Sequence, residues 1–253
     1  MKLFIDAACG CNVGKIRKNN EDNFFFADKC LELENLGLRN TVCFSDILKN
    51  GLCFAVFDGM GGENFGEAAS FAAARQMQAI ARSVSDYFVS ERKYLLKLTT
   101  QLNNAVVEAR KELFTDRCGS TMAALYFSSG FAYVCNVGDS RVYRLRDREF
   151  LQLSADHVEQ CPRGERKKAS LTQYLGIAPA DMQIEPYVAK GKIAKGDTYL
   201  LCSDGLTDML TNFEISNIML NCEEPEDSVQ KLIQSALEHG GWDNITVIVC
   251  KIV

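Results

Sequence analysis

The chain has 253 residues, of which 47% are hydrophobic, and a net charge of −5. This length and composition permit one globular domain with a sizeable core, and we expect a single domain over residues 1–253. The acidic balance argues against a general nucleic-acid binder, which needs a basic face. The N-terminal apolar stretch is too short for a signal peptide, and no window reaches the ~18 apolar residues of a membrane span. We therefore expect a cytoplasmic monomer that binds neither nucleic acid nor membranes.

The cysteines, 11 in number, are scattered along the chain without any C-x-x-C pair. Several of them lie inside apolar runs, namely Cys53, Cys135, Cys202 and Cys250. Reduced, buried thiols of a cytosolic protein explain this distribution. Cys9-Gly10-Cys11 is the one local pattern that suggests metal or redox chemistry.

The apolar patterning predicts strands over 24–27 and 52–57, and a loop or hairpin over the segment 28–50 between them. Apolar residues at helical spacing then predict two helices, one beginning near Gly66 and one over 89–114. Further strands are predicted over 119–127, 131–137, 141–146, 149–153 and 197–203. The chain is predicted to close with short helices near 206–220, a helix over 226–238 and a strand over 245–252. Strands clustered apart from long helices indicate the α+β class, with mainly antiparallel sheets and helices stacked outside.

Three apolar runs that have the composition of buried strands each end in an aspartate. These aspartates are Asp58, Asp139 and Asp204, and a fourth, Asp243, stands just before the apolar run 245–249. Carboxylates at the rims of buried strands can converge on one spot. Because several unneutralised carboxylates repel one another, a hard divalent cation is the usual solution. The pattern therefore predicts a metal-dependent enzyme.

Polar neighbours of these aspartates could complete such a site. The glycines after the first aspartate let the backbone turn tightly, and Gly59 could offer its carbonyl oxygen to a metal. Asn244 could orient the neighbouring carboxylate or a bound water. Near the N-terminus, Arg17 could bind two phosphate oxygens with its guanidinium fork, and Glu21 and Asp22 could hold metal-bound waters. Taken singly, a plain Asp-Gly turn or a solvated charged loop also explains these patterns.

Six short motifs occur in a fixed order along nearly the whole chain. They are Arg-x-x-Asn-Glu-Asp (17–22), Asp-Gly-Met-Gly-Gly (58–62), Gly-Ser-Thr (119–121), Val-Gly-Asp-Ser-Arg (137–141), Ser-Asp-Gly-Leu (203–206) and Asp-Asn (243–244). Each motif alone is weak, but all six in this order are highly specific. The ordered set resembles the metal-dependent protein serine/threonine phosphatases of type 2C, in their bacterial form.

The resemblance implies a four-layer α-β-β-α sandwich of two mainly antiparallel sheets flanked by helices. It also implies a two-metal centre in a cleft at one sheet edge. By position in the motifs, Asp58 would bridge both ions and the Gly59 carbonyl would bind one of them. Asp204 and Asp243 would bind the other ion. Ligands that are all oxygen favour Mn²⁺ or Mg²⁺ over Zn²⁺.

Further site residues follow from the same resemblance. Asp139 matches the family's ligand for a weaker third ion, with Asp208 as a helper there. Glu21 and Asp22 would contact the ions through water, and Arg17 would hold the substrate phosphate. A water or hydroxide that bridges the two cations would attack phosphorus in line, with no phospho-enzyme. The implied substrates are phosphoserine and phosphothreonine in proteins that a Ser/Thr kinase phosphorylates, which is a signalling function.

The chain departs from the family's pattern in three places. Met60 follows Asp-Gly where many eukaryotic members carry a histidine that is a candidate general acid, and His157 lies in a stretch that resembles the family's Asp-His-Ser. The flap that borders the site is shortened to 158–174, and the segment 28–50 has the features of an insertion. The flap is basic, which suggests either a solvated loop or a docking site for an acidic partner; its basic residues include Arg163, Arg166, Lys167 and Lys168.

Three other functions compete with this interpretation. A cysteine phosphatase is suggested by Cys-x5-Arg from Cys11 to Arg17 and from Cys135 to Arg141, but no histidine precedes either cysteine and Asp139 would repel phosphate. A metal-dependent nuclease fits two-metal chemistry but not the acidic net charge. The alternative without catalysis is a pseudophosphatase or regulatory binding module of the same fold, although such chains typically lose the metal carboxylates that this chain retains.

Overall fold

The computed structural model describes residues 2–60, 65–82, 90–115, 118–159 and 169–253. Every strand pairing that it contains between named strands is antiparallel. The first sheet has the order β3 (Val42–Ile47), β1 (Phe4–Asn12), β12 (Ile245–Ile252), β11 (Thr198–Cys202), β8 (Arg141–Arg146) and β9 (Glu149–Gln152). The second sheet has the order β10 (Tyr187–Lys192), β7 (Phe131–Val137), β6 (Met122–Ser128), β4 (Leu52–Met60) and β2 (Asp22–Phe25), with β5 (Gly119–Ser120) paired to β4.

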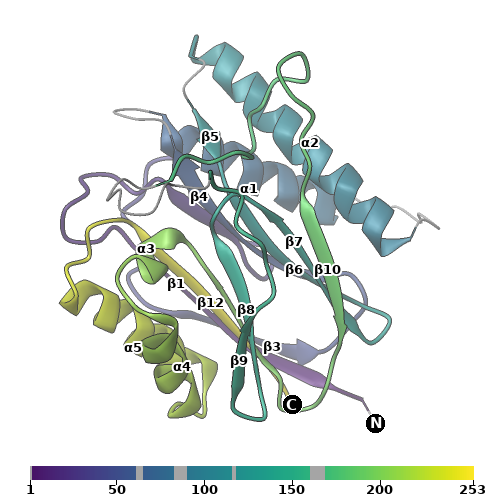
Figure 1. The fold of residues 1–253 in the computed structure, drawn as a ribbon, viewed down its shortest axis with the longest axis vertical. Coiled ribbons are helices and arrows are strands. Elements are labelled where there is room, and N and C mark those ends of the chain that lie inside the picture. The colour runs from purple at the N-terminus through teal and green to yellow at the C-terminus, as the bar shows by residue number, and fades with distance from the viewer. Residues whose placement is uncertain (1, 61–64, 83–89, 116–117, 160–168) are drawn as a thin grey trace.

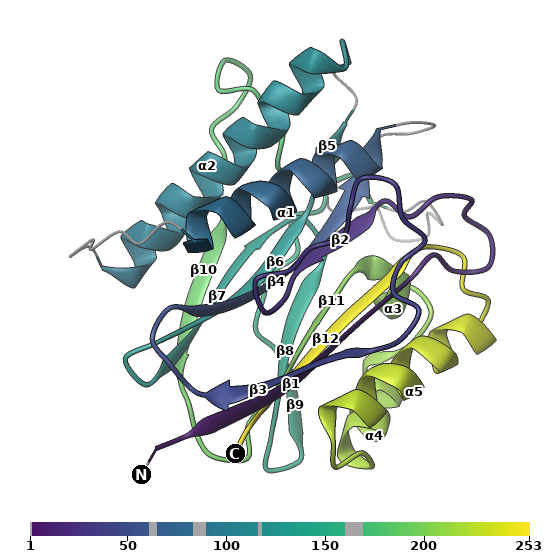
Figure 2. The same ribbon diagram turned by 180° about the vertical axis from the view of Figure 1, so that it is seen from behind.

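The helices cover the outer faces of the two sheets. They are α1 (Gly66–Arg82), α2 (Glu91–Glu112), α3 (Asp204–Thr207), α4 (Asn212–Leu220) and α5 (Pro225–Glu238). Figure 1 and the reverse view in Figure 2 show α1 and α2 against the second sheet and α4 and α5 against the first. The molecule is therefore a four-layer α-β-β-α sandwich, which confirms the predicted fold class. Both termini lie at the end of the sandwich away from α3 (Figure 1).

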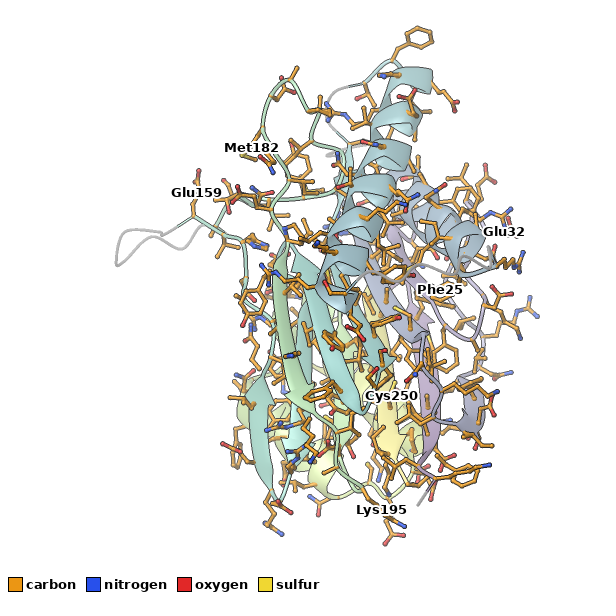
Figure 3. All side chains as sticks on the ribbon, turned by 90° about the vertical axis from the view of Figure 1, so that its right-hand side faces the viewer. Phe25, Glu32, Glu159, Met182, Lys195 and Cys250 are labelled. Carbon is orange, nitrogen blue, oxygen red and sulfur yellow. The ribbon has the colours of Figure 1, made fainter. Side chains whose placement is uncertain are left out.

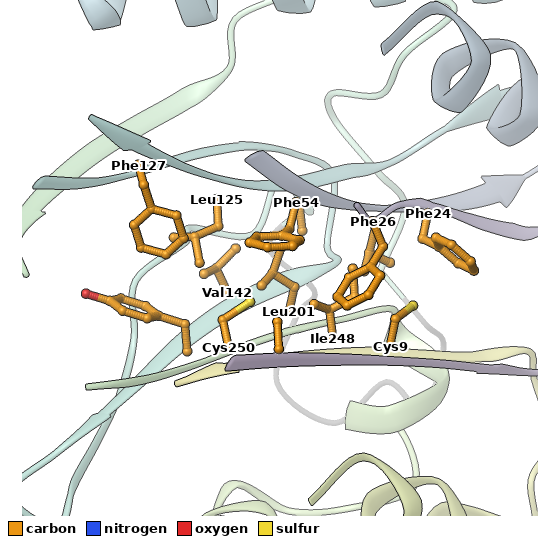
Figure 4. Close-up of a cluster of buried hydrophobic side chains, with 14 of the residues drawn as sticks. Cys9, Phe24, Phe26, Phe54, Leu125, Phe127, Val142, Leu201, Ile248 and Cys250 are labelled. Carbon is orange, nitrogen blue, oxygen red and sulfur yellow. The ribbon is translucent and has the colours of Figure 1, made fainter. Parts of the chain in front are cut away.

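Apolar side chains fill each of the three interfaces between layers. Figure 4 shows the middle interface, where Phe24, Phe26 and Phe54 of the second sheet meet Ile248 and Cys250 of the first. A second cluster joins the second sheet to α1 and α2, and a third joins the first sheet to the remaining helices. Since successive strand residues point to opposite faces, both sheets are apolar on both sides, as a sheet buried between two layers must be.

Local sequence signals set the helix ends at the outer layers. Thr211 and Glu214 form a reciprocal capping box at the start of α4, and Pro225 occupies the first turn of α5. The helix predicted from Gly66, the helix over 89–114 and the helix over 226–238 are all present within two residues of their predicted bounds, where those bounds lie in the described chain. Among the described residues, none of the helices has both the length and the apolar character needed to cross a membrane.

Three parts of the chain differ from the sequence predictions. The strands β1 and β10 were not predicted, and the segment 28–50 is not only a loop or hairpin, because its last part forms β3 at the edge of the first sheet. β3 is half-exposed and pairs with β1. Its strand conformation therefore comes from this pairing, because its local apolar pattern does not predict a strand. The basic run of the flap and the glycines Gly61 and Gly62 lie outside the described residues.

Candidate metal centre and phosphate site

Strand alternation directs Asp58 into the layer between the two sheets. Phe54 and Val56 of β4 belong to the middle cluster, and Asp58 follows at the same two-residue period. On the neighbouring strand, Asp22 pairs directly with Asp58 in the antiparallel register, just as Phe24 pairs with Val56. Two carboxylates therefore stand side by side where the apolar core between the sheets ends.

Asp22 links the second sheet to the first at this end. Its Oδ2 accepts hydrogen bonds from the Ser203 hydroxyl at 2.7 Å and from the Thr246 hydroxyl at 2.6 Å, and its side chain is buried. Ser203 comes directly before Asp204, so the same contact brings another of the predicted ligands to the cluster. These two hydroxyl residues were not predicted as site residues. Ser203 opens the Ser-Asp-Gly-Leu motif, whereas the only sequence signal for Thr246 is its position three residues after Asp243.

Asn244 fixes the N-terminal loop that carries Arg17. Its Oδ1 accepts from the backbone N–H of Glu21 at 2.7 Å, while its Nδ2 donates to the carbonyls of Val13 at 2.9 Å and Asn19 at 3.0 Å. The predicted role of Asn244 in orienting its neighbour or a water stays a prediction; its backbone N–H does donate to Asp243 Oδ1 at 2.8 Å. In addition, its side chain holds the 13–21 loop on the start of β12. The Lys15 N–H, which donates to the Gly241 carbonyl at 2.8 Å, also ties this loop to the C-terminal part of the chain.

Asp204 and Asp243 approach each other because α3 begins directly against the start of β12. A Cβ at Gly205 would lie 1.9 Å from the carbonyl oxygen of Asn244, so only glycine permits this packing. Asp204 is nearly buried as the first residue of α3, and the Asp208 N–H closes that short helix on the Asp204 carbonyl at 2.7 Å. Both predicted ligands of the second ion therefore lie at the edge of the first sheet, Asp204 at the start of α3 and Asp243 just before β12.

The turn that carries Asp139 is tied to β4 by hydroxyl groups. Thr121 Oγ1 accepts from the Asp58 N–H at 3.1 Å and lies 2.7 Å from the Ser140 hydroxyl. From the other side, His157 Nδ1 accepts from the Gly138 N–H at 3.1 Å, and Gly138 O accepts from the His157 N–H at 3.0 Å. His157 thus braces the Asp139 turn through a neutral imidazole. Burial also lowers its pKa, which favours that neutral form.

The carboxylates of the cluster share one electrostatic environment. Burial, followed by the charges of Asp204, Asp22, Asp139 and Asp243, raises the pKa of Asp58 well above its usual range. Burial is also the largest cause that raises the pKa of Asp22, to about 7, against the lowering effect of its two hydroxyl partners. Crowded carboxylates that resist ionisation are stabilised in their charged form by divalent cations. The all-oxygen donor set therefore fits hard ions such as Mn²⁺ and Mg²⁺.

Arg17 lies at the mouth of this cluster, paired with Asp243. Its Nη2 donates to Asp243 Oδ2 at 2.7 Å, and this hydrogen bond is the main cause that raises the pKa of Arg17. Across the residues that the structure describes, no three His, Cys, Asp or Glu side chains as they lie form a group able to hold a metal ion. The fold of the backbone thus brings the predicted ligands to one place, but the Asp243 carboxylate is paired with the Arg17 guanidinium.

Glu21 lies beside this ion pair at the edge of the cluster. Burial is the largest cause that raises the pKa of Glu21, and the charges of Glu67 and Asp243 act in the same direction. The charge of Arg17 opposes them. The backbone carbonyl of Glu21 accepts from the Gly59 N–H at 3.0 Å, which keeps the N-terminal loop against the end of β4. Glu21 is thus placed next to the candidate ligands.

The thiols that suggested a cysteine phosphatase are unsuited to that role. Cys11 and Cys135 are buried within the sandwich, and burial is the main cause that raises their pKa values to about 12 and about 11. A nucleophilic cysteine needs a lowered pKa and access to substrate. The Cys-x5-Arg patterns are therefore coincidental, and so is the metal or redox suggestion at Cys9 and Cys11, which lie in the core.

Comparison with known proteins agrees with this geometry. The family described as "Protein phosphatase 2C" matches residues 42–238. The chain belongs to the protein phosphatase 2C family. Among solved structures of this family, the catalytic domain of the serine/threonine protein phosphatase PstP in complex with two manganese ions superposes with a TM-score of 0.75 at 26% identity, over 99% of both chains. PppA of Pseudomonas aeruginosa, described as a key regulatory component of T6SS, gives 0.77 at 26% identity over 98% of both chains.

Two curated relatives of this 2C-family chain are bacterial proteins. It is 30% identical to the serine/threonine protein phosphatase PstP of Mycobacterium tuberculosis over 99% of its own length but 46% of that protein. The chain therefore spans about half the length of this curated relative. It is 29% identical to the serine/threonine phosphatase stp of Listeria monocytogenes over 94% of its length and 92% of that protein.

Proposed function

We propose that this chain is a metal-dependent phosphatase that removes phosphate from phosphoserine and phosphothreonine of proteins. The observation that carries the proposal is the meeting of Asp22, Asp58, Asp204 and Asp243, from four separate segments, beside the guanidinium of Arg17. Membership of the 2C family and the names of its bacterial relatives support the same reaction and substrate class.

The residues that would hold the ions are those with oxygen donors at the cluster. Asp58 and the Gly59 carbonyl would hold one ion, and Asp58, Asp204 and Asp243 a second, with Asp139 and Asp208 at a weaker third position. Glu21 and Asp22 would contact the ions through water. We assign Mn²⁺ or Mg²⁺ because every donor is oxygen. When bound, such ions supply positive charge to the phosphate and lower the pKa of a coordinated water.

The chain's own groups contribute orientation and charge. Arg17 would bind two phosphate oxygens with its planar guanidinium and neutralise the charge that develops on the transferred group. Its present partner, Asp243, would then be released to an ion. Asp22 would keep its place through the Ser203 and Thr246 hydroxyls, so the cluster is oriented before substrate arrives.

The biological setting that we propose follows from this activity. The substrates would be phosphoproteins made by a Ser/Thr kinase, in cytoplasmic signalling. We also propose a single domain over residues 1–253, which the apolar clusters that join the four layers support, and a monomeric state.

The direct test is turnover by the purified chain with Mn²⁺, with Mg²⁺ and with EDTA. We expect release of inorganic phosphate from p-nitrophenyl phosphate and from a phosphothreonine peptide, abolished by EDTA and restored by Mn²⁺. Single- and double-stranded DNA serve as parallel substrates that should remain intact. A chain that binds Mn²⁺ yet releases no phosphate would be a pseudophosphatase, and this result would refute the proposal.

A further inference from the structure

A second pocket lies immediately beside the candidate phosphate site. It has a volume of about 330 Å³ and is lined by residues 18–20, residues 33–36 and Glu67. Lys18 and Asn19 directly follow Arg17 in the chain, so one wall of this pocket is the loop that carries the phosphate-binding arginine. We call it the flank pocket.

The opposite wall of the flank pocket comes from the segment 28–50, whose purpose the sequence did not reveal. Figure 2 shows this loop beside the N-terminal loop near the start of α1. Asn35 Oδ1 accepts from Asn20 Nδ2 at 2.7 Å and from the Gly37 N–H at 2.9 Å. The Leu38 N–H donates to Cys11 O at 2.8 Å, which anchors the wall on β1.

Glycine makes this anchoring possible. Gly37 has φ +88° and lies so close to β1 that a Cβ would come within 2.3 Å of Cys11 O. On the remaining side, Asn19 Nδ2 donates to Glu67 Oε2 at 3.3 Å, so the first turn of α1 closes the pocket. The walls are therefore held by the fold before any ligand arrives, which lowers the entropy cost of binding.

The lining of the flank pocket is suited to an apolar group. Leu33 and Leu36 are 41% and 68% exposed. The charged residues around them are one lysine and two glutamates, which select no single sign of charge.

The position of the pocket separates it from the flap. Figure 3 shows Glu32, which precedes the leucine wall, on the side of the molecule opposite to Glu159, which lies near the start of the 158–174 flap. A polypeptide whose phosphate reaches Arg17 and which continues toward the flank pocket would pass over residues 18–20. The flank pocket would thus contact the side of the phosphorylated residue that lies away from Glu159.

We propose that the flank pocket binds an apolar side chain of the substrate polypeptide, near in sequence to the phosphorylated residue. This inference rests on the proposed phosphatase function and names a specificity determinant for it. Burying part of a leucine or phenylalanine against Leu33 and Leu36 should favour such substrates by about tenfold in kcat/KM over substrates with a small residue at that position. The 28–50 segment is then the element that selects substrate.

The test uses phosphothreonine peptides that differ at a single position, with leucine or alanine placed in turn at each of the four positions on either side. With Mn²⁺ bound, the natural chain should prefer leucine about tenfold at one or two positions. Leu33→Ser and Leu36→Ser should each reduce this preference, and together should bring it to within about twofold. Both side chains are exposed, so neither change should prevent folding, which thermal unfolding checks.

A matched control is Phe213→Ser on α4, where the side chain is 78% exposed and outside the flank pocket. This variant should keep the full leucine preference. The proposal is overturned if the natural chain shows no leucine preference at any position, if Leu33→Ser with Leu36→Ser retains it, or if Phe213→Ser loses it equally. Failure of the natural chain to dephosphorylate any of the peptides would instead refute the proposed phosphatase function, so the two failures are distinguishable.

Discussion

Arg17 and Asp243 form an ion pair across the candidate metal centre, with Nη2 and Oδ2 2.7 Å apart although the residues are 226 positions apart in the chain. One is the group that we assign to substrate phosphate, and the other is a group that we assign to a metal ion. Their side chains are 43% and 29% exposed, so solvent screens the pair and its net contribution to stability is small. An ion and a phosphate could therefore separate them at little cost.

Replacing Arg17 should have opposite effects on substrate and metal. In Arg17→Ala, KM for p-nitrophenyl phosphate should rise by about tenfold because the guanidinium fork is lost. The Mn²⁺ concentration for half-maximal activity should fall, because Asp243 no longer has a competing cation. Titrations of substrate and of Mn²⁺ measure both effects. In Arg17→Lys, KM and the Mn²⁺ concentration for half-maximal activity should lie between the values for the natural chain and for Arg17→Ala. An increase in the Mn²⁺ requirement of Arg17→Ala would contradict the competition.

Removing a carboxylate from the cluster should abolish activity without unfolding the chain. Asp58→Asn and Asp204→Asn should each lower kcat by at least about 100-fold, because the ions lose a ligand. Far-ultraviolet circular dichroism should be unchanged, and Mn²⁺ should no longer raise Tm. Near-full activity of Asp204→Asn would show that the ligand assignment is wrong.

The metal-free protein should lose stability as pH rises. The folded-state pKa of Asp22 is about 7, above its unfolded value, so the native state binds the proton more tightly between about pH 4 and pH 7. The free energy of unfolding then decreases with pH in that window, by at most ~1.4 kcal/mol per pH unit for one group. Urea denaturation in EDTA from pH 5 to 8 measures this slope.

Two comparisons check that the slope comes from the cluster. Asp22→Asn keeps an acceptor for the two hydroxyls but cannot ionise, so its slope should be shallower and its stability in EDTA at pH 8 higher. Mn²⁺ should raise Tm more at pH 8 than at pH 5, since it stabilises the ionised carboxylates. A slope that is identical in Asp22→Asn would exclude Asp22 as its source.

The hydroxyl of Thr246 should contribute measurably to stability. In Thr246→Val the shape is retained, but the buried Asp22 carboxylate loses a donor at 2.6 Å. We expect a loss of about 1–3 kcal/mol in the free energy of unfolding, measured by urea denaturation in EDTA at pH 8. Thr100→Val is the matched control, because Thr100 is exposed and its hydroxyl donates only to its own helix at Leu96 O; it should change stability by less than about 0.5 kcal/mol.

His157 should act as a brace and not as a general acid. Its Nδ1 already accepts from the Gly138 N–H, and burial lowers its pKa, so the fold favours the neutral imidazole. His157→Ala should leave a buried N–H unsatisfied and lower the free energy of unfolding by about 1–3 kcal/mol. The acid limb of its kcat–pH profile should remain where it is in the natural chain. A shift or loss of that limb would show that His157 transfers the proton.

The local periodicities of the sequence were sufficient for the long elements and the fold class. α1, α2 and α5 have apolar stripes at helical spacing, and β6, β7 and β12 are apolar runs of strand length. β10 has no such signal, because it contains Gly191 and two lysines and is an edge strand that, among the described residues, pairs only with β7. β1 is rich in alanine, cysteine and glycine, and its pairing with both β3 and β12 makes it a strand.

For the site, the sequence by itself determined which residues carry chemistry: aspartates at the ends of buried strands, glycines beside them and an arginine ahead of an acidic pair. Only the tertiary structure decided how they meet, including the pairing of Asp22 with Asp58, the hydroxyls that hold Asp22 and the ion pair of Arg17 with Asp243. Residue type and spacing are local properties that the chain encodes within a few positions. Contacts between residues that are far apart in the chain depend on strand register and sheet packing, which only the cooperative burial of the whole core fixes.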